Sequence, residues 1–128
     1  MSHKYIKEIT DLNNTPYGWS ENTGRDSIWL EQRKEYGFDE RETWSLDITF
    51  FCWLYERLMM FKEVNIIDLD FHKLKINGEE LTQGECINKM IDNCKAIIQS
   101  KDSDSNEIIN KKDEVLNIWK ECIYLMWW

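Results

Sequence analysis

Arginine and tryptophan side chains are concentrated in one part of this chain. Residues 19–57 hold all four arginines and four of the seven tryptophans: Arg25, Arg33, Arg41, Arg57, Trp19, Trp29, Trp44 and Trp53. A guanidinium group offers a planar set of donors that fits a phosphate or a carboxylate, and an indole offers a flat face for a nucleobase or a cation. This concentration predicts a binding site for a small nucleotide-like ligand.

The candidate ligand-binding residues all lie between positions 41 and 57: Arg41, Trp44, Asp47, Thr49, Trp53 and Arg57. One of the two indoles would stack on a base, and the two guanidinium groups would bind phosphates. The carboxylate or the hydroxyl would take ribose hydroxyls or base edges. The alternative is structural: the tryptophans belong to the core and the arginines pair with Glu40, Glu42 or Glu56 at the surface.

Carboxylates and one histidine offer a metal-based alternative. Two groups have suitable side chains: Asp39, Glu40, Glu42 and Asp47, and then Asp68, Asp70 and His72 at alternate positions. Either group could supply ligands to a divalent cation. However, Asp39 and Glu42 also fit a capping box, and a histidine in a charged hairpin is ordinarily solvated. No P-loop, HExxH or nucleophile-elbow pattern is present, so we expect a protein without catalytic residues, resident metal or cofactor, and a metal-dependent hydrolase is the less favoured alternative.

Hydrophobic periodicity predicts where the secondary-structure elements lie. A first helix covers 26–36 and ends at Gly37, and a helical turn starts at Asp39. A central helix follows Ser45 and continues to about residue 63, with apolar positions around nearly its whole circumference. Residues 66–81 alternate and contain Asn77-Gly78, which indicates a small β-hairpin or extended insertion. Helices starting at Thr82 and near residue 107 complete the pattern.

These elements predict one mostly α domain over 1–128, with about four helices around the central hydrophobic helix. Its expected parts are an extended N-terminal arm (1–23), motif-bearing helices (26–63), an insertion (64–81) and a C-terminal helical pair (82–126). Tyr17 and Trp19 would pin the arm onto the body. The apolar circumference of the central helix needs cover from other helices or from a second copy, so we expect a homo-oligomer.

Charge and composition exclude several classes of partner. The chain has 24 acidic and 16 basic residues, a formal net charge of −8 and a pI near 4.8. Such a charge disfavours nucleic acid and anionic membranes as partners. The longest apolar stretch, 48–60, is too short and too charged to span a bilayer, and the N-terminal residues do not resemble an export signal. The four cysteines form no CxxC pair, and we expect free thiols in a reducing cytosol.

One segment resembles a family of small phage and prophage accessory proteins. The order Gly37-Phe38-Asp39, Glu42-Thr43-Trp44 and Leu46-Asp47, followed by the run from Arg57-Leu58 to Phe61-Lys62-Glu63, is similar to that family's motif. The similarity continues through Phe71-His72-Lys73, Asn77-Gly78, Leu81-Thr82-Gln83 and Trp127-Trp128, over about 90 residues. The resemblance implies a bacteriophage origin, action in the cytoplasm of a bacterial host and an accessory role, but no specific activity.

Small phage accessory proteins commonly disable host defence, and two hypotheses follow from this analogy. In the first, the chain sequesters a nucleotide-derived immune signal, of cyclic-nucleotide or ADP-ribose type, without turning it over. In the second, it is an acidic inhibitor that binds and blocks a host defence protein such as a nuclease. The arginine and tryptophan concentration favours the first hypothesis, and the net charge of −8 favours the second.

Overall fold

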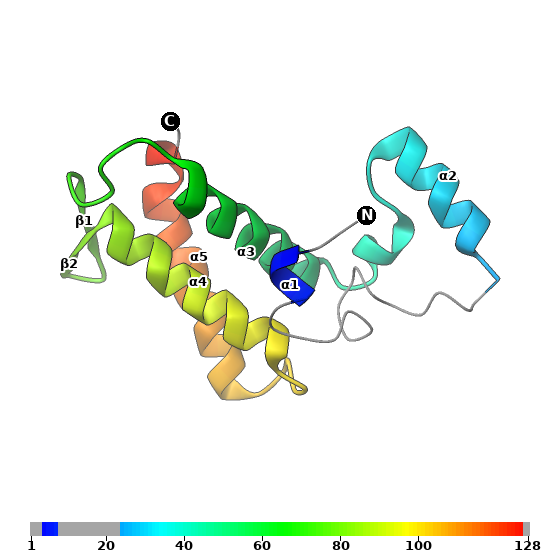
Figure 1. The fold of residues 1–128 in the computed structure, drawn as a ribbon. Coiled ribbons are helices and arrows are strands. Elements are labelled where there is room, and N and C mark those ends of the chain that lie inside the picture. Colours follow the sequence, from blue (N-terminus) through cyan, green and yellow to red (C-terminus); the bar gives the residue numbers. More distant parts are fainter. Residues whose placement is uncertain (1–3, 8–23, 127–128) are drawn as a thin grey trace.

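The computed structural model describes residues 4–7 and 24–126, and these residues form a mostly α fold with one small β-hairpin (Figure 1). The elements in chain order are α1 (Lys4–Lys7), α2 (Asp26–Tyr36), the 3-10 helix η2 (Glu40–Thr43), α3 (Leu46–Val64), β1 (Lys73–Ile76), β2 (Glu79–Thr82), α4 (Gln83–Gln99), α5 (Asn106–Cys122) and the 3-10 helix η3 (Ile123–Leu125). The predicted fold class is confirmed. The aromatic residues Tyr17, Trp19, Trp127 and Trp128 lie outside the described residues.

Helices α3, α4 and α5 form the central bundle, in which α4 packs against both of the others (Figure 1). The buried face of α4 carries apolar residues spaced three and four apart, including Ile87, Met90, Cys94 and Ile97. Residues at this spacing lie on one side of a helix, so α4 buries a continuous apolar stripe. This packing provides most of the contiguous core.

The hairpin closes one end of the central bundle. Strands β1 and β2 pair antiparallel with Leu74 opposite Leu81, and Asn77 and Gly78 connect them at φ 51° and 82°. Two successive residues with positive φ make the turn whose twist suits a two-residue hairpin. Leu81 and Ile76 are buried at 4% and 6% exposure, so the hairpin is held by the core. The predicted hairpin is confirmed.

Capping groups fix several helix boundaries. The Thr82 hydroxyl accepts from the Glu85 backbone N–H, and the Glu85 side chain accepts from the Thr82 backbone N–H, which completes the predicted capping box of α4. Gly37 ends α2 in the left-handed conformation at φ 85°, also as predicted. Asp39 does cap η2, but its carboxylate accepts from the backbone N–H of Arg41, two residues on and not three.

The described start of the predicted arm is helical and not extended. In α1, Tyr5 and Ile6 are buried, and the Tyr5 hydroxyl donates a hydrogen bond to the Glu63 carboxylate on α3. A single turn of helix is unstable alone, so packing against α3 holds α1 in place.

Helix α2 and the 3-10 helix η2 form the N-terminal lobe, residues 26–43, which lies beside one end of α3 (Figure 1). Among the described elements, η2 packs against α3, whereas α2 makes no extensive contact with the central bundle. Trp29 is buried within the lobe and does not belong to the contiguous core. Among the described residues, most contacts of the lobe are therefore made within the lobe and with η2's neighbour α3.

Candidate functional site

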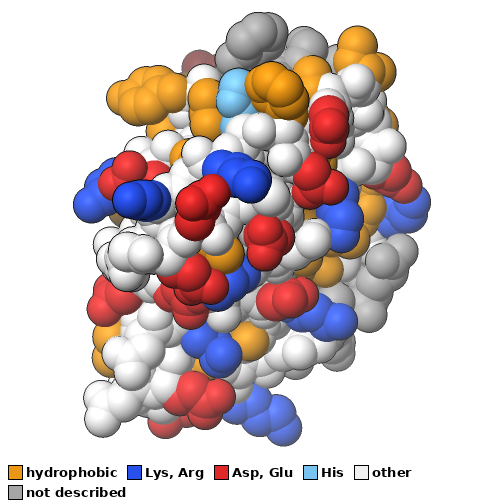
Figure 2. All heavy atoms as spheres, turned by 90° about the vertical axis from the view of Figure 1, so that its left-hand side faces the viewer, with side chains coloured by type: hydrophobic (Ala, Val, Ile, Leu, Met, Phe, Trp, Pro, Cys, Tyr) orange, Lys and Arg blue, Asp and Glu red, His pale blue; other side chains and the backbone are white. Residues whose placement is uncertain are grey.

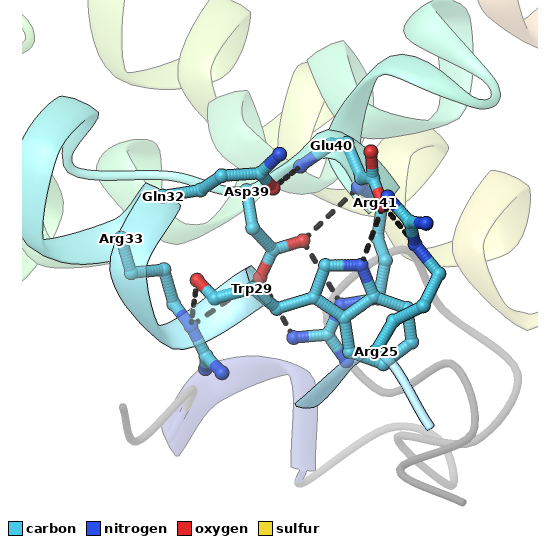
Figure 3. A network of polar contacts seen from close by, with 7 residues as sticks. All are labelled: Arg25, Trp29, Gln32, Arg33, Asp39, Glu40 and Arg41. Carbon is cyan, nitrogen blue, oxygen red and sulfur yellow. Dashed lines mark hydrogen bonds and ion pairs between the residues drawn. The ribbon is translucent and has the colours of Figure 1, made fainter. Parts of the chain in front are cut away.

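The side chains of Asp39 and Arg41 form a bidentate ion pair in the N-terminal lobe (Figure 3). Arg41 donates from Nε to Asp39 Oδ1 over 2.9 Å and from Nη2 to Oδ2 over 2.8 Å. Both residues are buried, at 5% exposure for Arg41 and 4% for Asp39. A guanidinium group bound in this way uses its two best-aligned N–H donors on a carboxylate of its own chain.

Ionised Asp39 is stabilised by the surrounding cations. Burial of the carboxyl raises its pKa, but the hydrogen bonds and charge of Arg41, with a smaller contribution from Arg33, outweigh burial and leave the pKa lowered. Arg33 Nε lies 3.3 Å from Asp39 Oδ2. The Asp39 carboxylate therefore pairs with both guanidinium groups and also accepts a hydrogen bond from the Arg41 backbone N–H.

Trp29 joins the ion pair to the rest of the lobe. The Arg41 guanidinium carbon lies 4.4 Å from the Trp29 ring centroid, a cation–π distance, and Trp29 Nε1 donates to Glu40 Oε1 over 2.9 Å. Glu40 also accepts from Arg25 Nε over 2.6 Å, and the hydrogen bonds of Trp29 and Arg25 lower its pKa. The edge of Trp44 meets Trp29 with ring centroids 6.2 Å apart. This arrangement ties α2 to η2.

Trp53 and Arg57 occupy a different place, on the outer side of α3. The Arg57 guanidinium lies 4.8 Å from the Trp53 ring centroid, and Phe50 stacks on Trp53 at 6.2 Å with an interplanar angle of 18°. Trp53 is 40% exposed. These side chains are neighbours one turn apart on a single helix, so α3 alone positions them.

Asp47 and Thr49 lie in the first turn of α3. Asp47 accepts hydrogen bonds from Lys112 Nζ and from the Ser45 hydroxyl, both over 2.8 Å. The Lys112 hydrogen bond lowers the pKa of Asp47 most, against an opposing effect of burial. Among the described residues, the Thr49 hydroxyl is buried with no hydrogen-bond partner. Asp47 thus links α3 to α5, which is a structural use of a predicted ribose-binding residue.

The hollows lined by described residues include at most one of the six predicted ligand-binding residues. Arg41 lies in the N-terminal lobe and Trp44 directly follows it with its ring against Trp29, whereas Trp53 and Arg57 lie on the outer side of α3. A hollow of about 590 Å³ between α1 and α3 includes only Arg57 from the six, together with Lys4, Tyr5, Glu56, Met60 and Glu63. The Arg25–Glu40 pair agrees with the structural alternative for that arginine.

A second hollow lies where the α3–β1 connection meets the C-terminal end of the bundle. Its volume is about 480 Å³, and Ile67, Asp68, Phe71, His72 and Leu125 line it. Figure 2 shows hydrophobic side chains gathered around a histidine at the upper edge of this face, whereas charges of both signs are mixed below.

We name as the end patch three exposed residues of the two segments that line this hollow, Ile66, Phe71 and Tyr124, whose exposed fractions are 83%, 75% and 85%. Sequence reasoning missed it because the two contributing segments lie about 50 residues apart and each has an ordinary pattern. The signal in the sequence was the set of apolar residues Ile66, Ile67, Leu69 and Phe71 in the connection between α3 and β1.

The residues considered for metal binding do not form a site in the described part of the chain. No group of three or more histidine, cysteine, aspartate or glutamate side chains there could hold a metal ion. Asp68 and Asp70 lie in the turn before β1, where the Asp68 carboxylate accepts from the Asp70 backbone N–H. An Asx-type turn explains this pair of acidic residues without a ligand.

The four cysteines are free and buried. Burial raises the pKa of Cys94 and of Cys122 to about 12, and it raises the pKa of Cys52 further with a contribution from Glu56. A thiol is a nucleophile only as its thiolate, so these groups are chemically quiet in the folded protein.

None of the described helices is long and apolar enough to cross a lipid bilayer. Comparison of the chain with protein-family models, with curated proteins and with solved structures finds no match. Function must therefore be inferred from the geometry of the described residues.

Proposed function

We propose that this protein is a non-catalytic binding protein that acts by covering a partner protein. The observation that carries the proposal is the end patch, whose three side chains are at least 75% exposed beside an apolar hollow of about 480 Å³. Large apolar groups that are exposed gain free energy when a partner removes them from water. The hollow can accept a side chain of that partner.

The charge of the chain favours a partner with a basic surface. Asp68 lines the hollow, Asp70 is exposed nearby, and the formal net charge is −8. Such a surface attracts a positively charged partner over long range and orients its approach. A host defence nuclease, whose nucleic-acid-binding face is basic, has the required chemistry. The resemblance to phage accessory proteins supports a bacterial host protein as the target.

Sequestration of a nucleotide signal is the second candidate, and one observation favours it. Lys4, Tyr5 and Arg57 line the hollow of about 590 Å³ between α1 and α3. Glu56 and Glu63 line the same hollow, however, and their carboxylates would repel a phosphate group. The Arg41 fork is bound to Asp39. Both observations make a nucleotide a poorer fit than a protein.

The proposal is tested by capture and reconstitution. Immobilised wild-type protein, the double variant Phe71→Ser with Tyr124→Ser, and the control Ile109→Ser would be incubated with bacterial extract. Ile109 is an exposed apolar residue on α5 away from the hollow. We expect a host protein that the wild type and the control retain and the double variant loses. Calorimetry with that purified protein should then show affinity that falls as salt is raised.

A parallel thermal-shift screen with cyclic nucleotides, ADP-ribose and NAD separates the two candidates. A bound nucleotide at a hundredfold excess over its Kd stabilises the folded state by about 2.7 kcal/mol. Stabilisation of this size by any nucleotide would favour sequestration and overturn the proposal. Retention of the same proteins by the wild type and by the double variant would also overturn it.

A further inference from the structure

The outer side of α3 carries a stripe that is apolar except for one arginine, and we name this stripe the α3 seam. Its members are Leu46, Phe50, Trp53, Arg57, Met60 and Val64. Their spacings alternate between four and three residues, the spacing at which a helix presents one seam to a partner helix. The core side of α3 uses mainly other positions, among them Phe51, Leu54 and Leu58, although the half-buried Phe50 also packs against the core.

The α3 seam is accessible in the described part of the structure. Leu46, Met60, Val64 and Trp53 are 68%, 55%, 45% and 40% exposed, although α1 and η2 already pack against the same helix. A surface helix normally turns charged or polar residues outward. Instead, α3 turns four large apolar residues outward, spread over about 27 Å between Leu46 and Val64.

The positions of the seam are self-complementary in an antiparallel arrangement. The residue numbers of the first and last members add to 110, and so do those of the second and fifth members and of the third and fourth. A two-fold axis that passes beside residue 55 therefore places every seam residue of one chain opposite a seam residue of the other. A two-fold symmetric interface requires this reciprocity, in which residue i meets j and j meets i.

The chemistry of the pairs agrees with this arrangement. Leu46 would meet Val64, Phe50 would meet Met60, and the Trp53 ring would meet the Arg57 guanidinium. Within one chain Arg57 already lies over Trp53 at 4.8 Å, so the second copy would offer the cation the other face or edge of an indole. Glu56 lines the same hollow as Arg57 and adds an acidic group beside the seam near the axis.

We propose that the α3 seam binds a second copy of this chain, with the two α3 helices antiparallel and residue i opposite residue 110 − i. The proposal goes beyond the function proposed above, because it concerns a different surface from the end patch. A contact through one helix lies at the small end of protein interfaces, so we expect a reversible dimer with a Kd of order micromolar.

Paired charge variants test the interface and its register together. Leu46→Glu adds an anion at the N-terminus of α3 and Val64→Lys adds a cation at its C-terminus, and both charges suit the helix dipole. Each variant alone should raise the dimer Kd at least tenfold. An equimolar mixture of the two should restore dimerisation, because the carboxylate introduced at position 46 of one chain would face the ammonium introduced at position 64 of the other. Light scattering after size exclusion would report the mass relative to the 15.6 kDa chain.

The control is Leu116→Lys on α5, a residue with the same 45% exposure as Val64, and it should leave the dimer unchanged. Circular dichroism would verify that every variant folds. A wild-type protein that remains monomeric at about 100 µM, roughly a hundredfold above the expected Kd, overturns the proposal. Singly substituted chains that dimerise as well as the wild type would overturn it too.

Disulfide crosslinking distinguishes antiparallel from parallel pairing. Residues 46 and 64 of one chain lie about 27 Å apart, too far for a disulfide within the chain. Leu46→Cys mixed with Val64→Cys should give a crosslinked dimer on mild oxidation, and Leu46→Cys alone should not. The native cysteines are buried and do not compete. Crosslinking of Leu46→Cys with itself would contradict the antiparallel register.

Discussion

At the scale of single residues, the Asp39 carboxylate of the N-terminal lobe binds several groups of the described chain at once. It accepts from the Arg41 side chain, from the Arg41 backbone and from Arg33. We expect Asp39→Asn to cost about 3 kcal/mol in the local opening of α2, because it leaves a buried guanidinium without its counter-charge. Hydrogen exchange of the α2 amides measures this. Glu31→Gln, which removes an exposed pair with Lys34, should cost less than about 0.5 kcal/mol.

The same carboxylate makes stability depend on pH in a defined window. The pKa of Asp39 is lower in the folded chain than its ordinary value of 3.8, so the unfolded chain takes up the proton first as pH falls. Its contribution is complete above that value and is lost as pH falls through the folded pKa. The stability difference between wild type and Asp39→Asn should therefore be constant at neutral pH and shrink below about pH 4. A difference that stays constant down to about pH 3 would contradict this assignment.

Thiol reactivity gives a second prediction for individual residues. Because Cys52, Cys94 and Cys122 are buried and their pKa values are raised, iodoacetamide at about pH 8 should leave them unmodified in the folded protein. Mass spectrometry should show full alkylation of all four cysteines after denaturation in urea. Rapid modification of a native cysteine would mean that the bundle opens locally far more readily than its packing indicates.

Arg41 shows what sequence reasoning could not resolve at this scale. A guanidinium beside tryptophans is equally suited to a phosphate and to a carboxylate of the same chain. The backbone decides between these two partners, because the turn from Asp39 into η2 places the Arg41 side chain against the Asp39 carboxylate and over the Trp29 ring. Helical periodicity has no information about such a turn.

At the scale of elements, local signals predicted the boundaries well. Asn77-Gly78, Gly37 and the Thr82–Glu85 box each act within a few residues, so their effects can be recognised without tertiary contacts. The helical turn α1 was missed because packing against α3 holds it and no internal signal marks it. The sequence also could not show which sides of α3 other elements cover, because apolar residues surround nearly the whole helix.

The capping box of α4 leads to a prediction at this scale. Thr82→Ala removes the acceptor of the Glu85 backbone N–H, so it should lower the free energy of unfolding by about 1 kcal/mol. Urea denaturation followed by circular dichroism would measure the change. Ser27→Ala, at an exposed position inside the first turn of α2, is the control and should change stability by less than about 0.5 kcal/mol. Equal effects of the two substitutions would show that the cap contributes little.

At the scale of the whole molecule, the described residues form a bundle with a contiguous core and a lobe that has its own buried centre. The bundle core includes residues of α1, the hairpin and α3 to α5, whereas Trp29 stands outside it. The two surfaces proposed for binding both belong to the bundle side of the molecule. The end patch lies at the junction of the α3–β1 connection with the C-terminal end, and the α3 seam runs along the outer side of α3. Substitution of Phe71 and Tyr124 therefore alters the end patch without changing any residue of the α3 seam.

Substitution of Trp29 tests whether the N-terminal lobe and the bundle unfold separately. Its side chain is 1% exposed and contacts Glu40, Trp44 and Arg41, so Trp29→Ala should remove about 3 to 5 kcal/mol from the lobe. Because α2 makes no extensive contact with the bundle among the described elements, the loss should stay local. We expect the α2 amides to exchange at rates close to those of an unfolded peptide, with protection in α4 and α5 unchanged. Trp119→Ala, on the bundle side of α5, should give the opposite pattern, in which α4 and α5 lose protection. Loss of α4 and α5 protection in Trp29→Ala would mean that lobe and bundle unfold as one cooperative unit.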